Sequence, residues 1–119
     1  MTQTGLTEAT PLPSGTIPAL HFPDVRLLAV FDSDGPRPQF LLDSTKLRLI
    51  LAGLEPGQQL PAHPELLAVY YFLEGEGVMT VNGDEFPVAP GATVVAPSGS
   101  ARGVRAATRL VFLAVRAGA

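Results

Sequence analysis

The sequence predicts an all-β fold, a β-barrel with little or no helix. Twelve glycines and twelve prolines occur among 119 residues, and both residue types interrupt helices but suit tight turns between strands. Between these turns lie short, evenly spaced runs rich in apolar, β-branched and aromatic residues, as in a barrel or sandwich. A chain of this length is close to the commonest domain size, so we expect a single barrel domain.

The first 23 residues are predicted to form an extended arm that precedes the barrel. Four prolines, at positions 11, 13, 18 and 23, stand there among Ser, Thr and Gly without a sustained period. The predicted organisation is therefore a proline-rich arm over residues 1–23 and a barrel domain over residues 24–119.

The predicted strands are short apolar runs bounded by residues that favour turns. In chain order they cover residues 25–31, 39–43, 47–54, 66–73, 78–81, 86–88, 93–96 and 109–115. The turn-rich residues 32–36 predict a loose hairpin between the first two runs. The third run ends at Pro56-Gly57, and the fourth is apolar throughout, as in a strand covered on both faces. Asn82-Gly83 is the strongest short hairpin signal in the chain.

The turns in the second half of the chain resemble the two conserved motifs of single-domain cupins. The residues that carry the resemblance are Leu73-Glu74-Gly75-Glu76-Gly77, Val81-Asn82-Gly83-Asp84, Pro90-Gly91 and Pro97-Ser98-Gly99. They follow the order and spacing of those motifs over residues 50–106. The resemblance implies a cupin-type jelly-roll barrel, in most members a homodimer, with a pocket inside the barrel that in many members holds a divalent metal through three His and one Glu.

The second cupin motif begins well in this chain but loses its metal ligand. Gly91, Pro97 and Gly99 stand at the expected positions, whereas Arg102 occupies the position of the third His and Ala106 that of the Asn. The resemblance therefore implies that a permanent positive charge replaces one ligand.

The first cupin motif fits the chain in two registers, both of which retain a histidine. Counting back from its final glycine places Ala68 at the Glu position, His63 at the second His position and Pro61 at the first. Counting forward from its initial glycine places His63 at the first His position, Glu65 at the second and Tyr70 at the Glu position. The registers differ by two residues, and strand side chains repeat their facing every second residue, so both direct His63 into the barrel.

The same alternation predicts the other residues of the pocket. In a regular strand Gln59 and Glu65 share the face of His63, and placing position 68 inward brings Tyr70 and Phe72 inward with it. The predicted ligand pocket contains His63, Arg102, Tyr70, Glu65, Gln59 and Phe72.

We expect no cofactor, because His63 is the only certain metal ligand. Cysteine is absent, and a first-row metal needs about three or four N or O ligands. The alternative is Fe, Mn, Ni or Zn bound weakly or with non-standard ligands that include His63.

Arg102 has two interpretations at this stage. It could grip the carboxylate or another anionic group of a small ligand, together with His63 and Tyr70. It could instead be structural, paired with Glu65, or point to solvent.

The preferred function is a small-molecule-binding barrel without a tightly bound metal, with a site for an anion or carboxylate. One alternative is an enzyme, either a metal-dependent oxygenase or isomerase with an unusual ligand set or an acid-base catalyst that uses His63 and Arg102. Another is a dimeric interaction module with a vestigial pocket, in which the strand at 110–115 and the N-terminal arm build the interface.

Composition limits the partners and the location. The net charge is -3, and no stretch combines clustered Lys and Arg with aromatic residues as nucleic-acid surfaces do. No apolar run approaches the roughly 20 residues that span a bilayer, and the start of the chain lacks the basic and apolar regions of a signal peptide. We therefore expect a cytoplasmic protein that binds a small molecule and neither nucleic acid nor membrane. The resemblance to cupins adds the expectation of a homodimer.

Overall fold

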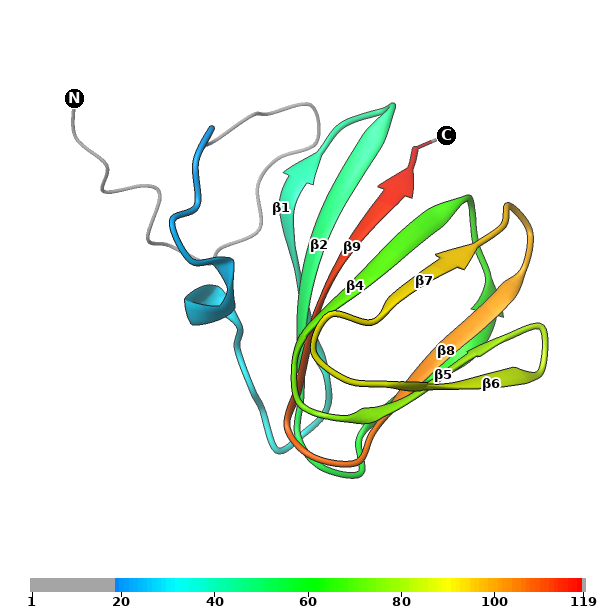
Figure 1. Cartoon of the computed structure of the whole chain (residues 1–119). Helices are drawn as coiled ribbons and strands as arrows, with labels where there is room; N and C mark the ends of the chain where they lie inside the picture. Colours follow the sequence, from blue (N-terminus) through cyan, green and yellow to red (C-terminus); the bar gives the residue numbers. More distant parts are fainter. Residues whose placement is uncertain (1–18, 119) are drawn as a thin grey trace.

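The computed structural model describes residues 19–118 as two antiparallel β-sheets packed face to face (Figure 1). One sheet has five strands in the order β1-β2-β9-β4-β7, and the other has four in the order β3-β8-β5-β6. The strands are β1 (Arg37–Asp43), β2 (Leu47–Leu54), β3 (Gln59–Pro64), β4 (Ala68–Glu74), β5 (Gly77–Val81), β6 (Asp84–Val88), β7 (Thr93–Ala96), β8 (Ala101–Ala106) and β9 (Leu110–Ala117). The predicted all-β fold is confirmed. Most of the predicted arm, residues 1–18, lies outside the described residues.

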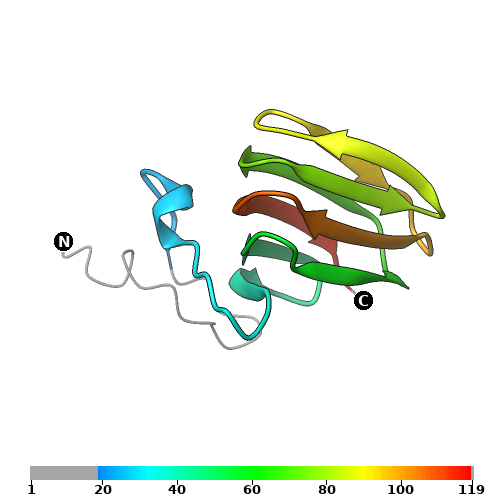
Figure 2. The ribbon, with the colours of Figure 1, turned by 90° about the horizontal axis from the view of Figure 1, so that it is seen from below.

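Strands far apart in the sequence lie side by side because the chain crosses repeatedly between the two sheets. The last strand, β9, is inserted between β2 and β4, and β8 lies between β3 and β5. Figure 2 shows the two layers from below. The main core fills the space between them, where the inward side chains of both sheets interdigitate. Its fully buried members include Phe72, Met79, Leu54 and Leu110.

The strand predicted at residues 25–31 is wrong, because this segment begins with a 3₁₀ helix, η2 (Val25–Leu28). The carboxylate of Asp24 caps the helix by accepting from the backbone N–H of Arg26. The apolar residues at both ends of η2 pack on the outer face of the five-stranded sheet, over Leu51 and Val111. A short apolar run fits a strand or a helical turn equally well, and packing on the sheet decides between them here. The first hairpin is instead β1 with β2.

Strands β3 and β8 are not among the apolar runs predicted as strands, and they pair with each other. Their sequences, QLPAHP and ARGVRA, are polar or interrupted by Pro and Gly, so propensity alone does not indicate strands. The predicted hairpin turn does join β5 and β6, with positive φ angles of 51° at Asn82 and 87° at Gly83. No helix within residues 19–118 has the length and apolar character needed to cross a membrane.

Candidate functional site

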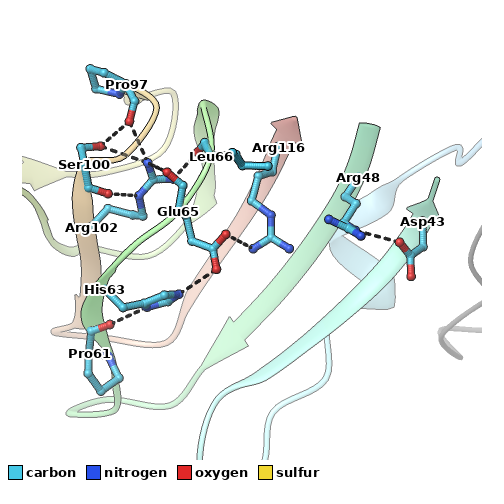
Figure 3. Close-up of polar contacts among 10 residues, drawn as sticks. All are labelled: Asp43, Arg48, Pro61, His63, Glu65, Leu66, Pro97, Ser100, Arg102 and Arg116. Atoms are coloured by element: carbon cyan, nitrogen blue, oxygen red, sulfur yellow. Dashed lines mark hydrogen bonds and ion pairs between the residues drawn. The ribbon is translucent and has the colours of Figure 1, made fainter. Parts of the chain in front are cut away.

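A pocket of about 240 Å³ lies between the two sheets. Strands β1, β2, β4 and β9 supply one wall, and β3 and β8 supply the other. The wall is built mainly from apolar and aromatic side chains: Pro38, Phe40, Ile50, Leu60, Tyr70, Val104, Phe112 and Ala114. Four polar residues complete the lining, and Figure 3 shows them as sticks: His63, Glu65, Arg102 and Arg116.

The alternation of side chains along β9 explains how the apolar wall of the pocket and Arg116 come to lie next to each other. In β9 the side chains of Leu110, Phe112 and Ala114 belong to the core between the sheets. Arg116 follows Ala114 by two residues, so it faces the same way and reaches the pocket. One face of β9 therefore supplies both apolar residues of the pocket, Phe112 and Ala114, and the charged residue Arg116.

Arg102 is almost fully buried, with an exposed fraction of 2%. Its Nε donates to the carbonyl oxygen of Ser100 at 2.9 Å, and Nη1 donates to that of Leu66 at 2.9 Å. Nη2 contacts the carbonyl oxygens of Glu65 at 3.2 Å and Pro97 at 3.0 Å, and the Ser100 hydroxyl at 3.0 Å. A guanidinium has five N–H donors, so few remain for a ligand.

The structure therefore supports the structural interpretation of Arg102, with one correction. The expected partner was the carboxylate of Glu65, but Arg102 contacts the backbone carbonyl of that residue instead. The guanidinium joins β8 to the loops before β4 and after β7. All its hydrogen-bond partners within the described residues are neutral oxygens, so no carboxylate pairs with Arg102 there.

The carboxylate of Glu65 lies between His63 and Arg116 (Figure 3). Its Oε2 is 3.2 Å from Nε2 of His63, and its Oε1 is 3.5 Å from Nη1 of Arg116. Nδ1 of His63 lies 3.2 Å from the carbonyl oxygen of Pro61. Both ring nitrogens of His63 thus lie beside oxygen atoms, one from a backbone carbonyl and one from a carboxylate. His63 itself is at the open edge of the pocket, with 59% of its side chain exposed.

Arg116 is the polar residue of the pocket with the weakest pairing. Its contact with Glu65 is long for a charge-assisted hydrogen bond. Its Nε is buried and has no hydrogen-bond partner among the described residues. With Arg102 it brings two positive charges to a lining that contains one carboxylate, so the pocket is electropositive even when His63 is neutral.

Four of the six residues predicted for the pocket line it: His63, Arg102, Tyr70 and Glu65. The placement of Gln59 on the face of His63 is wrong. Gln59 pairs with Arg105 on the outer side of the four-stranded sheet, because a bulge between Leu60 and His63 breaks the alternation.

Phe72 does point inward, as predicted, but it does not line the pocket. Its side chain is fully buried and packs against Phe112, with ring centroids 5.5 Å apart. Phe72 therefore belongs to the core next to the pocket wall.

Arg116 is the main pocket residue that the sequence analysis missed. The predicted last strand ended at residue 115, two residues before the end of β9 and one residue before Arg116. Extending the alternation of Leu110, Phe112 and Ala114 by one step would have placed Arg116 inside.

The residues at the pocket do not fit the metal that many cupins hold. No group of three His, Cys, Asp or Glu side chains comes together within residues 19–118. In the pocket lining the candidate donors are His63 and Glu65, and two guanidiniums stand beside them. A first-row metal needs about three or four ligands, and adjacent cations oppose its binding.

The chain matches the family model for the cupin domain over residues 50–116, which is more than half of its length. No curated protein matches its sequence.

Several solved structures share the fold. The structure of TT1209 from Thermus thermophilus is 33% identical, with a TM-score of 0.74, and the match covers 80% of this chain and 94% of that one. An RmlC-like cupin from Desulfovibrio desulfuricans is 29% identical, with a TM-score of 0.69 and coverages of 74% and 87%. A salicylate 1,2-dioxygenase from Pseudoaminobacter salicylatoxidans is 20% identical, with a TM-score of 0.65; the match covers 71% of this chain and 27% of that one, and it shows the fold alone. The family match and the shared two-sheet barrel together show that this chain belongs to the cupin family.

Proposed function

We propose that the protein binds a small organic anion, with an apolar body and a carboxylate or other anionic end, in the pocket between the sheets and without a tightly bound metal. The observation that carries this proposal is the buried Nε of Arg116, which has no acceptor among the described residues and lies beside an apolar wall. Leaving a buried donor unsatisfied costs about 1–3 kcal/mol. The side chain of Arg116 is 19% exposed, so a ligand oxyanion can contact its guanidinium and would remove that cost once the side chain turns its Nε toward the pocket.

The apolar wall supports a ligand with a hydrophobic body. Phe40, Ile50 and Phe112 face the pocket, and Tyr70 adds an aromatic ring. Small-molecule pockets usually exceed about 300 Å³, and this one holds about 240 Å³. The volume favours a ligand the size of one substituted ring.

The charge balance supports an anion as the polar end of the ligand. Arg102 is buried and has only neutral oxygen partners, and the ion pair of Arg116 with Glu65 is long. Positive charge held in a partly desolvated site attracts anions more strongly than the same charge in water. In this proposal Arg116 contacts the ligand, and Arg102 supplies long-range attraction while holding the loops in place.

The test uses benzoate, phenylacetate and hexanoate as probes and isothermal titration calorimetry as the measurement. We expect at least one probe to bind the wild type and Arg116→Gln to raise its Kd about tenfold or more, because a charge-assisted hydrogen bond is lost. The matched control is Arg105→Gln, which removes the same charge from an exposed position on β8. Binding by none of the three probes, or an equal effect of both variants, would contradict the proposal.

The absence of a tightly bound metal stays a prediction that the same protein preparation can test. We expect elemental analysis to find no stoichiometric Fe, Mn, Ni or Zn. A near-stoichiometric metal that disappears in His63→Ala would favour the metal-dependent oxygenase or isomerase instead.

We also infer that the protein forms a homodimer through an apolar strip on the outer face of the five-stranded sheet. The strip consists of Val69 and Tyr71 on β4, Val95 on β7 and Val115 on β9, all exposed. The register places Val115, Val69 and Val95 in one row across three strands. The strip carries no charge, so two copies can face each other without like-charge contacts.

A further inference from the structure

Two arginines, Arg48 on β2 and Arg116 on β9, stand directly opposite each other in the strand register. Ile50 and Ala114, the next pair on the same face, belong to the core between the sheets. Arg48 and Arg116 therefore both extend from the inner face of the five-stranded sheet, just beyond the apolar wall. Figure 3 shows their guanidiniums next to each other, between the carboxylates of Asp43 and Glu65.

Each guanidinium in this arginine pair keeps donors that no described residue uses. Arg48 donates from Nε to Oδ1 of Asp43 at 2.8 Å. Among the described residues, this is the one side chain to which Arg48 donates. Arg116 reaches Glu65 only at 3.5 Å, and its Nε is buried without a partner among the same residues. Like charges directly opposite each other on neighbouring strands destabilise a sheet. An anion placed between them would offset that repulsion.

We propose that the arginine pair binds a doubly charged anionic group, so that the ligand of the pocket is a phosphate monoester or a dicarboxylate rather than a monocarboxylate. This inference rests on the proposed function, because the body of the ligand occupies the same apolar pocket. One carboxylate forms a two-pronged contact with a single guanidinium. A phosphate group, or a second carboxylate, offers further oxygens that accept from Arg48 as well.

The two guanidiniums of the arginine pair match the two charges of a dianion, which would compete for them with the carboxylates of Asp43 and Glu65. Arg48 and Asp43 are partly exposed, with 27% and 22% of their side chains accessible. Arg48 can therefore turn its free donors toward a ligand while it keeps the contact with Asp43.

The test compares benzoate with phenyl phosphate, which keeps the ring and changes the anionic end. Calorimetric titrations are run at about pH 8, where a phosphate monoester carries close to two charges, and at one fixed ionic strength. We expect the wild type to bind phenyl phosphate about tenfold more tightly than benzoate, because a second charge-assisted contact forms. Isophthalate, which carries two carboxylates on one ring, is the third probe. It distinguishes a site for a phosphate monoester from a site for any doubly charged group.

The variant Arg48→Gln assigns the effect to the arginine pair. We expect it to raise the Kd for phenyl phosphate several times more than the Kd for benzoate, so that the preference for the doubly charged probe is lost. Arg105→Gln is the charge-matched control and should retain the preference. Thermal unfolding of each variant verifies that it is folded, and both altered side chains are accessible to solvent.

The outcomes separate this inference from the function on which it rests. A preference for phenyl phosphate alone assigns a phosphate ester, and a preference shared by isophthalate assigns a double charge in either form. Equal binding of benzoate and both dianions overturns the arginine-pair proposal and leaves carboxylate binding standing. A preference that survives Arg48→Gln also overturns it. Failure of all probes, including the monocarboxylates, contradicts the proposed function itself.

Discussion

Arg102 and Arg116 are two arginines of one pocket, and their hydrogen-bond partners differ. The guanidinium of Arg102 is bound by carbonyl oxygens of two loops, the one before β4 and the one between β7 and β8, so its position is determined by the fold. The guanidinium of Arg116 has one long ion pair and a buried N–H without a partner among the described residues. An arginine whose N–H groups all have acceptors would lose hydrogen bonds if it changed partners. An arginine with unused N–H groups can donate to a ligand without that loss.

The structural role of Arg102 can be tested by Arg102→Met, which keeps much of the volume and removes every hydrogen bond. We expect the free energy of unfolding to fall by about 2–4 kcal/mol, because several buried carbonyl oxygens lose their partner. Urea denaturation measures the change.

The control for this variant is Arg105→Met, which alters an exposed arginine three residues along β8. We expect a change within about 0.5 kcal/mol there, as for most surface substitutions. If both variants lost the same small amount of stability, Arg102 would not be a structural connection.

Among the elements, the turn between β4 and β5 depends on a glycine for two separate reasons. Gly75 has a φ of +81°, which favours glycine, and a Cβ atom built there would lie 1.7 Å from the carbonyl oxygen of Arg109. Gly57 has nearly the same φ, +84°, but a Cβ there would meet no atom within 4 Å. The two positions therefore separate backbone strain from steric overlap.

We expect Gly57→Ala to cost about 1 kcal/mol of unfolding free energy, which is the left-handed strain of a non-glycine residue. Gly75→Ala should cost about 3 kcal/mol or more, because backbone atoms of the β8–β9 connection must also move. Urea denaturation of the two variants checks the difference. Equal losses would mean that the β8–β9 connection moves without cost and that backbone strain alone accounts for the lost stability.

Strand β3 shows how one element changes which residues reach the site. A regular strand would place Gln59 and His63 on the same face, four residues apart. The bulge between Leu60 and His63 turns Gln59 outward and keeps His63 at the pocket. Bulges depend on the pairing partner, here β8, and local sequence carries little information about that partner.

At the scale of the whole molecule, one part of the outer face of the five-stranded sheet is covered and another part is exposed. The segment around η2 covers Leu51 and Val111, whereas the apolar strip on β4, β7 and β9 is exposed. In the alternative of a dimeric interaction module, the interface was predicted at residues 110–115 and the N-terminal arm. However, β9 is a central strand and most of its apolar side chains are buried in the core, and residues 1–18 of the arm lie outside the described residues. Val115 is its exposed contribution to the strip.

The homodimer can be tested by Val95→Lys, at the most exposed residue of the strip, 60% accessible. We expect sedimentation analysis to find a dimer for the wild type and a monomer for the variant, because two lysines would be buried in one symmetric interface. Gln59→Lys, on the exposed outer side of the other sheet, is the control and should remain dimeric. A monomeric wild type, or a Val95→Lys dimer of unchanged stability, would contradict the inference.

The cytoplasmic location stays a prediction.

The sequence by itself determined the all-β class, the hairpin at Asn82-Gly83 and the cupin family, because turn residues act locally and their order along the chain is visible without a structure. It also placed His63 at the pocket, since two registers agreed on that position. Only the tertiary structure decided which arginine is available to a ligand. Arg102 and Arg116 carry the same side chain, but two of the carbonyl oxygens that bind the first, those of Glu65 and Leu66, come from a segment distant in sequence, and Nε of the second has no partner among the described residues. Hydrogen-bond partners and strand neighbours of this kind arise only when the two sheets close on each other.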